Sequence, residues 1–382
     1  MEPEKKLKIC FILGIDPFFD GGMGMYQRNL LEYLKSCDYE VSVVYFGKEN
    51  KEFFKENVKY IELKSSLPYP LDQIMDNFKI LKYIKKNDFD VINSHALWGA
   101  WMQFYKKRKN QTLVHTYHGV TYYFFKSHLE RFNLIKKVLL SPLLAFSYLV
   151  EKPPMKKADK VICVSRRVQR ELEKLYCKRK NIEFIRTGVD LQKFKIYEKS
   201  RVKRKLKLDQ EKTYGLYVGR GGYWTKGLDR VIKISEGIYN LNKNYRLIVI
   251  GADLKKVGHL LNKKFILYIE QGKREMMPYY YNSADVFFCM SRYEGGAPTL
   301  VTSEAMASGC LVVCSKDSEQ EIIEDKKNGL IIEEFGEKDA EKVLEILKDK
   351  KKKEEMIKNS IKTIKEISLE TWGKKYLEVL FS

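Results

Sequence analysis

Long hydrophobic runs are missing from this chain of 382 residues. No stretch reaches 18 consecutive apolar residues, whereas a membrane-spanning helix needs about 20. The first residues, MEPEKKLKICFIL, fit neither a signal peptide nor a membrane span. We therefore expect a chain that does not cross a membrane.

Cysteine pairs are missing as well. The seven cysteines are an odd number without CxxC spacing, and Cys10, Cys163 and Cys314 lie inside apolar, strand-like runs. Buried thiols of this kind are typical of a reducing compartment. The sequence therefore predicts a cytoplasmic protein.

Acidic residues are too few to balance the basic ones, and the net charge is +21. A basic balance favours polyanions or an anionic membrane face, although lysine enrichment is also a habit of heat-adapted proteins. None of the recognised DNA- or RNA-reading motifs occurs. We expect no nucleic-acid partner and prefer attraction to the inner, anionic face of a membrane.

The sequence does contain two successive series of apolar runs that alternate with helical patterns. Such a series is typical of a parallel α/β sheet, and a chain of this length is expected to form two domains. The charged stretch Lys195–Lys212 is the predicted linker. The expected domains are residues 1–195 and 196–362, with a C-terminal helix at 363–382 that packs back on the first. The expected strands are Leu7–Gly14, Val41–Phe46, Tyr60–Leu63, Val91–Ser94, Thr112–Tyr117, Ala158–Ser165, Ile182–Thr187, Tyr214–Val218, Arg246–Gly251, Phe265–Ile269, Val286–Met290 and Leu311–Ser315.

Candidate ligand-binding residues of the first half follow its strands. Gly21 and Gly22 come after the first strand, where open α/β sheets bind ligands, but they do not form a GxGxxG dinucleotide fingerprint. His118 follows the strand Thr112–Tyr117 and is the better functional candidate. His95 is predicted to line the cleft wall or to be packed, and His115 to lie in the core. The triplet Asp88-Phe89-Asp90 is interpreted as a structural turn, so no metal and no cofactor are predicted.

The segment Tyr122–Lys157 is aromatic, basic and apolar together. Basic residues beside leucine, phenylalanine and tyrosine suit an interfacial helix on a membrane surface. The alternative is a long helix that packs on its own domain and is kinked at Pro142. Both interpretations remain open from the sequence.

The second half carries two candidate ligand loops. The first, Gly219–Gly227, places Arg220 and Lys226 between glycines at the end of a strand, where fixed cations suit a diphosphate leaving group. The second, Ser291–Gly309, is a glycine loop that leads into a helix. Its Thr/Ser-rich entry supplies capping oxygens, and the free N–H groups of the helix start suit a phosphate, so Gly296, Ala297 and Thr299 are candidate donor-binding residues. Its Glu294 and Glu304 suit sugar hydroxyls.

These pieces, in this order, resemble the retaining glycosyltransferases of the family-4 type. The similar segments are GGMGMYQRNLLEYL, TYHG, ADKVICVS, TGVDLQKF, YVGRGGYWTKGLDRVIKI, LIVIGAD, YYYNSADVFFCMSRYEG, SEAMASG and NGLII. The resemblance covers nearly the whole chain. It implies the GT-B fold, in which two Rossmann-like domains with parallel sheets face a central cleft.

The resemblance also implies roles for individual residues. Gly21 and Gly22 are similar to the loop that approaches the donor, and His118 to the histidine that contacts the transferred sugar. Arg220 and Lys226 match the cations that neutralise the diphosphate. Glu304 resembles the second glutamate of the family's E-x7-E motif, which binds the nucleotide ribose.

The first glutamate of that motif is displaced in this sequence. The usual spacing leads to Gly296, eight residues before Glu304, whereas Glu294 lies ten residues before it. Either a longer loop returns Glu294 to the same place, or the backbone N–H groups of Gly296 and Ala297 replace the carboxylate. We favour the longer loop.

We therefore expect transfer of a hexose, with retention, from a UDP- or GDP-linked sugar to a hydroxyl of a glycan or a lipid-linked acceptor. A nucleotide-sugar 2-epimerase of the same fold is one alternative, because the Glu294 and Glu304 pair could be its acid and base. A catalytically silent sugar-nucleotide binder is another, given the altered spacing. A basic nucleic-acid-binding protein is a third, and would bind in a salt-dependent way.

Overall fold

The computed structural model describes residues 6–14, 16–19, 21–67, 75–219 and 223–382. Contacts divide the chain into two units. Unit 1 consists of the residues up to Gly188 together with Leu369–Ser382, and unit 2 is Val189–Ser368. The division therefore falls on the N-terminal side of the expected linker.

Unit 1 is built around an eight-stranded sheet in its described part, with the strand order β3-β4-β2-β1-β5-β6-β7-β8. All neighbouring pairs are parallel except β3 with β4, so β3 is an antiparallel edge strand that the sequence did not predict. The strands are β1 (Lys8–Ile12), β2 (Glu40–Gly47), β3 (Lys51–Lys55), β4 (Val58–Lys64), β5 (Val91–His95), β6 (Thr112–Tyr117), β7 (Lys160–Cys163) and β8 (Ile182–Phe184). The helices are α1 (Gly22–Leu34), α3 (Asn77–Lys86), η1 (Ala96–Phe104), α4 (Thr121–Leu129), α5 (Leu134–Leu140), α6 (Pro142–Lys157), α7 (Arg166–Leu175) and α15 (Leu369–Phe381).

Unit 2 contains a six-stranded parallel sheet in its described part, with the order β11-β10-β9-β12-β13-β14. The strands are β9 (Thr213–Val218), β10 (Tyr245–Ile250), β11 (Ile266–Ile269), β12 (Val286–Cys289), β13 (Leu311–Ser315) and β14 (Leu330–Ile332). The helices are α8 (Lys199–Lys205), α9 (Leu228–Leu241), α10 (Leu254–Leu261), η2 (Arg274–Met276), α11 (Met277–Ser283), α12 (Leu300–Ala307), η3 (Lys316–Ser318), α13 (Glu337–Lys348) and α14 (Lys350–Lys365).

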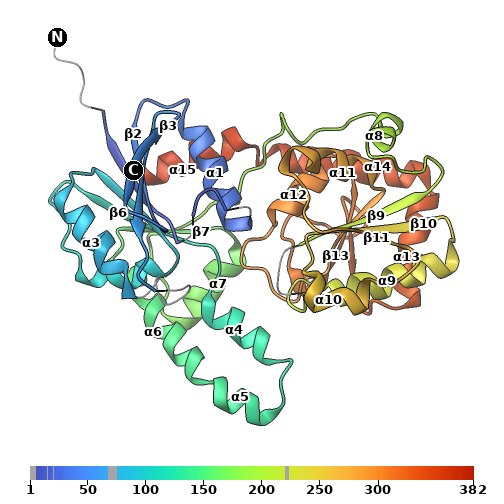
Figure 1. The fold of residues 1–382 in the computed structure, drawn as a ribbon, viewed down its shortest axis with the longest axis horizontal. Helices are drawn as coiled ribbons and strands as arrows, with labels where there is room; N and C mark the ends of the chain where they lie inside the picture. Colours follow the sequence, from blue (N-terminus) through green and yellow to red (C-terminus); the bar gives the residue numbers. More distant parts are fainter. Residues whose placement is uncertain (1–5, 15, 20, 68–74, 220–222) are drawn as a thin grey trace. The chain divides into compact units, whose positions relative to one another are not determined.

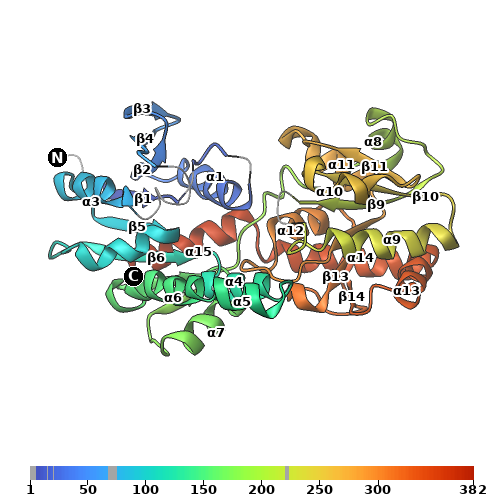
Figure 2. The ribbon, with the colours of Figure 1, turned by 60° about the horizontal axis from the view of Figure 1, so that its bottom comes forward.

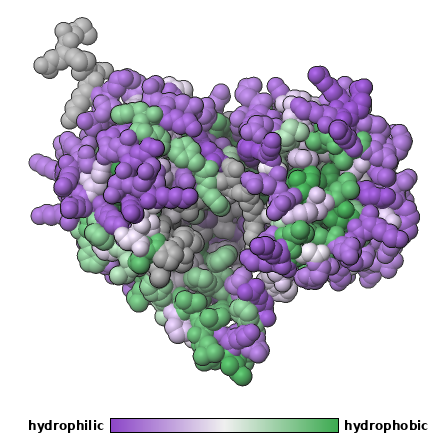
Figure 3. All heavy atoms as spheres, viewed as in Figure 1, coloured by the Kyte–Doolittle hydropathy of each residue, from purple (hydrophilic) through white to green (hydrophobic). Residues whose placement is uncertain are grey.

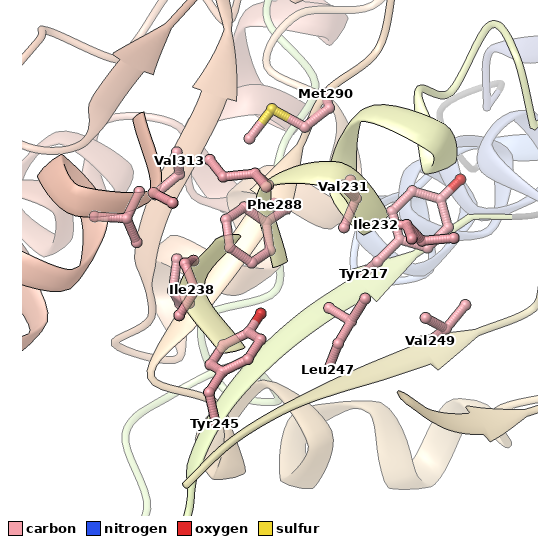
Figure 4. Packing of buried hydrophobic residues seen from close by; sticks show 14 of the residues in the cluster. Tyr217, Val231, Ile232, Ile238, Tyr245, Leu247, Val249, Phe288, Met290 and Val313 are labelled. Carbon is pink, nitrogen blue, oxygen red and sulfur yellow. The ribbon is translucent and has the colours of Figure 1, made fainter. Parts of the chain in front are cut away.

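The core of unit 2 lies on both faces of its sheet, because both faces are covered by helices (Figure 1). Successive residues of β12 point to opposite faces, so Phe287 packs with α11 and α12 while Phe288 packs with α9. Figure 4 shows the buried residues on the face that packs against α9, where Phe288 and Tyr245 lie beside Ile238. The continuous apolar strands seen in the sequence are therefore those of a sheet buried on both sides.

Two expectations about the chain's connections were wrong. The charged stretch Lys195–Lys212 is not an open linker: it contains α8, which buries Val202 and packs against α11. The expected C-terminal helix at residues 363–382 is interrupted: α14 ends at Lys365, α15 starts at Leu369, and Val189 pairs with Ser368 between them. The second of them, α15, packs against α1, β5 and β6 within unit 1.

The helices α4, α5 and α6 form a protrusion of unit 1. Helices α4 and α6 pack side by side, and α5 closes their far end (Figures 1 and 2). Pro142 is the first residue of α6, so it starts a new helix and does not kink a long one, as a proline without an N–H can do at that position. In the described part of the chain, every helix is too short or too polar to cross a membrane.

Candidate functional site

Lys226 lies in a loop of unit 2 that is fastened from two sides. The loop runs from the end of β9 to Gly227, which caps α9 with a φ of +68°, and a Cβ on Gly227 would stand 1.9 Å from the Met290 carbonyl oxygen. Arg292 binds the carboxylate of Asp229 at 2.8 and 2.6 Å and donates to the Trp224 carbonyl at 2.6 Å. These contacts hold the loop against the segment that follows β12.

Lys226 and Glu294 form the central ion pair of this region. Lys226 Nζ lies 2.7 Å from each carboxylate oxygen of Glu294, and Ser291 Oγ donates to Glu294 Oε1 at 2.6 Å. Burial lowers the pKa of Lys226, but the Glu294 carboxylate more than offsets that effect, so its pKa is raised. The ammonium therefore stays charged, and Glu294 reaches it despite the altered spacing.

Glu304 lies in α12 and is almost fully buried, at 2% exposure. Arg274 Nη2 lies 2.7 Å from its Oε1, and the Tyr281 hydroxyl donates to its Oε2 at 2.9 Å. A carboxylate has about four lone-pair directions. These two partners therefore fix its orientation and leave acceptor capacity for further donors.

The N-terminus of α12 is capped by Thr299, whose side chain accepts from the Thr302 N–H. The Thr299 N–H itself donates to Gln320 Oε1 at 3.0 Å. Gly296 is half-buried and Ala297 is fully buried in the loop that leads to this cap. The predicted loop and cap are thus adjacent in the structure, and their contact with a donor stays a prediction.

In unit 1, His118 directly follows β6 and ends a buried chain of polar side chains. Its Nε2 lies 2.8 Å from His95 Nδ1, and His95 Nε2 lies 2.7 Å from Asn93 Oδ1. Burial lowers the pKa of His118 to about 4, so it is neutral near pH 7. His118 is partly exposed, whereas His95 is fully buried.

The two predicted donor glycines behave differently. Gly21 caps α1, and a Cβ there would stand 2.8 Å from the Phe19 ring, whereas a Cβ on Gly22 would meet no described atom within 4 Å. Gly24 is the nearby position where a side chain would clash with the backbone, because a Cβ there would stand 2.2 Å from the Phe19 carbonyl oxygen. Arg220, the fourth predicted catalytic residue, lies outside the described residues.

The Asp88-Phe89-Asp90 triplet has structural partners. Asp90 Oδ2 accepts from the Lys8 N–H at 2.7 Å, Asp88 pairs with Arg108, and Phe89 is buried. Across the described ranges, there is no group of three or more His, Cys, Asp or Glu side chains arranged to hold a metal ion. The triplet lies between α3 and β5, and both of its carboxylates have partners within unit 1.

The structure adds residues that the sequence did not single out. Arg274 and Tyr281 hold Glu304, Ser291 holds Glu294, and Arg292 holds the Lys226 loop. Arg274, Tyr281 and Arg292 make these contacts with residues distant in the sequence, so no local pattern indicates them. Ser291 alone carried a signal, because it stands three residues from Glu294.

Comparison with known families covers most of the chain. A family model described as Glycosyltransferase Family 4 matches residues 20–193, and one described as Glycosyl transferases group 1 matches residues 198–363. Together they leave unmatched only the two ends of the chain and residues 194–197.

Individual relatives are distant. An uncharacterized glycosyltransferase, MJ1069, of Methanocaldococcus jannaschii is 24% identical over 361 residues, which cover 86% of each chain. Sucrose-phosphate synthase from Thermosynechococcus elongatus has a TM-score of 0.81 at 20% identity, covering 98% of each chain. Anabaena Alr3699/HepE, solved in complex with UDP and glucose, has a TM-score of 0.75 at 17% identity, covering 98% of this chain and all of its own. These two structures share the fold of this chain.

Proposed function

The chain belongs to the group 1 glycosyltransferases and has the GT-B fold. We propose that it transfers a hexose from a UDP-sugar to an acceptor hydroxyl, with retention of configuration. The observation that carries the proposal is the pair of carboxylates in unit 2. Glu294 is bound to Lys226, and Glu304 is held by Arg274 and Tyr281. A UDP-sugar is the preferred donor because the HepE structure with UDP and glucose has the same fold.

The donor would be held by groups that are already oriented. Glu304 would accept hydrogen bonds from the ribose hydroxyls on its remaining lone pairs, since charge-assisted bonds of this type are strong. The loop of Gly296 and Ala297 and the start of α12 at Thr299 would lie along the diphosphate, where a helix N-terminus favours negative charge. In this view Glu294 would lie by the donor sugar.

The chemical step would depend on charge stabilisation of the leaving group. As the bond to the sugar breaks, negative charge develops on the UDP phosphate, and Lys226 together with Arg220 would stabilise it. The leaving phosphate would accept the acceptor's proton on the same face, so the reaction needs no separate protein base. His118, Gly21 and Gly22 are assigned to the side of the transferred sugar. No metal or cofactor is part of the proposed reaction.

The acceptor is proposed to be a glycan or a lipid-linked intermediate, bound by unit 1. The supporting feature is the basic and apolar segment Tyr122–Lys157, which forms the protrusion. We place the enzyme in the cytoplasm, at the inner face of the membrane.

The proposal is tested by a thermal-shift panel of nucleotide sugars, followed by product analysis. A bound donor stabilises the folded state, and at a hundred times its Kd the gain is about 2.7 kcal/mol. We expect UDP-sugars to raise the Tm, and Glu304→Leu to remove that rise. No shift with any UDP- or GDP-sugar would contradict the proposal. An epimer formed from donor alone would assign the site to epimerisation.

A further inference from the structure

The tip of the protrusion exposes a large apolar surface. In α5 no residue is buried, and Leu134, Ile135, Val138 and Leu139 are 62–76% exposed. These four residues share one face of the helix, because they are spaced by one, four and five positions. The surface continues along α6 through Leu149, which is 63% exposed. Figure 3 shows the hydrophobic residues gathered at this end of the protrusion.

The same segment is strongly basic. Between residues 121 and 157 there are seven lysines and arginines and only two acidic residues. One of the two, Glu151, is buried and accepts from the Thr121 N–H at 2.8 and 3.0 Å, so it does not offset the surface charge. Lys136 and Lys137 lie on α5 on the side opposite the apolar face. Exposed leucines flanked by cations are the composition of an interfacial helix.

We propose that α5 and the adjoining face of α6 dock onto an anionic lipid surface. The apolar face would enter the boundary between headgroups and acyl chains, and the flanking lysines would contact anionic headgroups. A bilayer fits both properties of the surface, its exposed apolar area and its net positive charge. A soluble monomer seldom leaves such a patch uncovered. This proposal gives the acceptor-side unit a membrane partner and does not depend on which donor is used.

The test is sedimentation of the full chain with vesicles of phosphatidylcholine alone or mixed with phosphatidylglycerol. We expect binding to the anionic vesicles that weakens as salt is raised. The triple variant Leu134→Ser, Ile135→Ser and Leu139→Ser should reduce the partition coefficient on the order of 100-fold. Its Tm should stay unchanged because these side chains are exposed. Phe54→Ser, at a side chain that is 74% exposed on β3, is the matched control and should bind as the parent does.

Two results would overturn the proposal. One is equal partition of the triple variant and the parent into anionic vesicles. The other is a parent chain that is dimeric in solution and becomes monomeric in the triple variant, since the apolar face would then be covered by a second copy. The rise in Tm caused by a UDP-sugar, whose proposed site lies in unit 2, should be unchanged in the triple variant, so a failure of the proposed donor binding is seen separately.

A second inference concerns the proton positions in the chain that ends at His118. Asn93 Nδ2 donates to Thr116 Oγ1 at 3.1 Å, and the Tyr376 hydroxyl lies 2.8 Å from both Thr116 Oγ1 and Asn93 Oδ1. Each group then has one consistent role: Thr116 donates to the Tyr376 oxygen, and Tyr376 donates to Asn93 Oδ1. Asn93 Oδ1 is therefore an acceptor toward His95 as well.

This arrangement fixes the tautomers of both histidines. Because a carbonyl oxygen only accepts, the proton near Asn93 lies on His95 Nε2. A neutral imidazole carries one N–H, so His95 Nδ1 has a bare lone pair and must accept from His118 Nε2. We infer that Asn93, acting through His95, is a positioning residue that holds His118 with an unprotonated Nδ1. Under the proposed function, that nitrogen would accept a hydrogen bond from a sugar or acceptor hydroxyl.

The tautomer can be measured without any substrate. In the full chain labelled with ¹⁵N-histidine, the five histidines are few enough to resolve, and loss of a signal in His118→Asn identifies His118. We expect a protonated Nε2 and an unprotonated Nδ1. Asn93→Leu should mix the two tautomers, whereas Asn93→Asp keeps an acceptor oxygen and should retain the parental one. A protonated His118 Nδ1 in the parent chain would overturn the inference, whatever the activity shows, even if Asn93→Leu fails to fold.

Discussion

Replacing Lys226 with alanine removes the cation that Glu294 binds. The lysine side chain is 39% exposed and the glutamate side chain 9%. An ion pair with one exposed partner contributes about 1 kcal/mol or less to stability, so the Tm should fall by about 2–4 °C at most. The loss in kcat should be far larger, on the order of 10²–10³, the scale of one donor that stabilises developing charge.

The carboxylate left behind makes this prediction sharper. In Lys226→Ala the diphosphate would approach Glu294 without the neutralising ammonium, and a like-charge contact costs several kcal/mol. Adding Glu294→Gln removes that repulsion, so the double variant should bind donor about tenfold more tightly than the single variant, a change of about 1.4 kcal/mol. Its kcat should not recover, because the cation is still missing. Donor titration and steady-state kinetics measure the two effects, and near-normal turnover of Lys226→Ala would refute the reasoning.

Three further perturbations follow from the described contacts. Glu304→Leu leaves Arg274 without its carboxylate and should lower the free energy of unfolding, measured in urea, by about 3 kcal/mol. The double variant with Arg274→Met should regain most of that stability. Equal stability of the single and double variants would contradict this. Gly227→Ala places a Cβ against the Met290 carbonyl at positive φ and should cost about 2 kcal/mol or more, so an unchanged Tm would argue against the loop geometry. Burial lowers the pKa of His115 to about 3. Below about pH 6.5 this histidine therefore binds a proton in the unfolded chain but not in the folded chain. Stability should therefore fall as pH drops from 6.5 toward 4, by about 1.4 kcal/mol per pH unit for this residue, and His115→Asn should reduce that slope in urea unfolding followed across the range.

Buried strands were the elements that the sequence predicted best. The expected strands Thr112–Tyr117 and Leu311–Ser315 have the same bounds as β6 and β13. Both are short runs of mainly apolar or β-branched residues, and both lie in the interior of their sheets. Where a strand is buried on both faces, its apolar run coincides with the element itself.

Elements stabilised by partners distant in the sequence were predicted poorly. Helix α8 looked like a linker because it has few large apolar residues, but it packs against α11 and buries Val202 and Lys203. The break between α14 and α15 also lacked a strong sequence signal, since both helices carry apolar residues at helical spacing. Tyr376 bonds to Asn93 across 283 positions, a contact that no local pattern encodes.

The displaced glutamate shows how a loop can absorb a change of spacing. Helix α12 has a fixed start, because Thr299 caps it and is itself held by Gln320, and Glu304 therefore keeps its place in the helix. Upstream, Arg292 is bound to Asp229, which fixes the other end of the loop. The extra residues can then lie only between these anchors, in the glycine-containing stretch 295–298, where the backbone has the most freedom.

Between those two anchors, the Glu294 carboxylate contacts Lys226. Glu294 contacts both Ser291 and Lys226, although its spacing from Glu304 differs from the family's. The role of this carboxylate toward a donor, as against the backbone N–H groups of Gly296 and Ala297, stays a prediction. Deleting Gly295 and Gly296 should therefore strain the contact between Glu294 and Lys226 more than it disturbs Glu304, because only the loop lies between the two anchored ends.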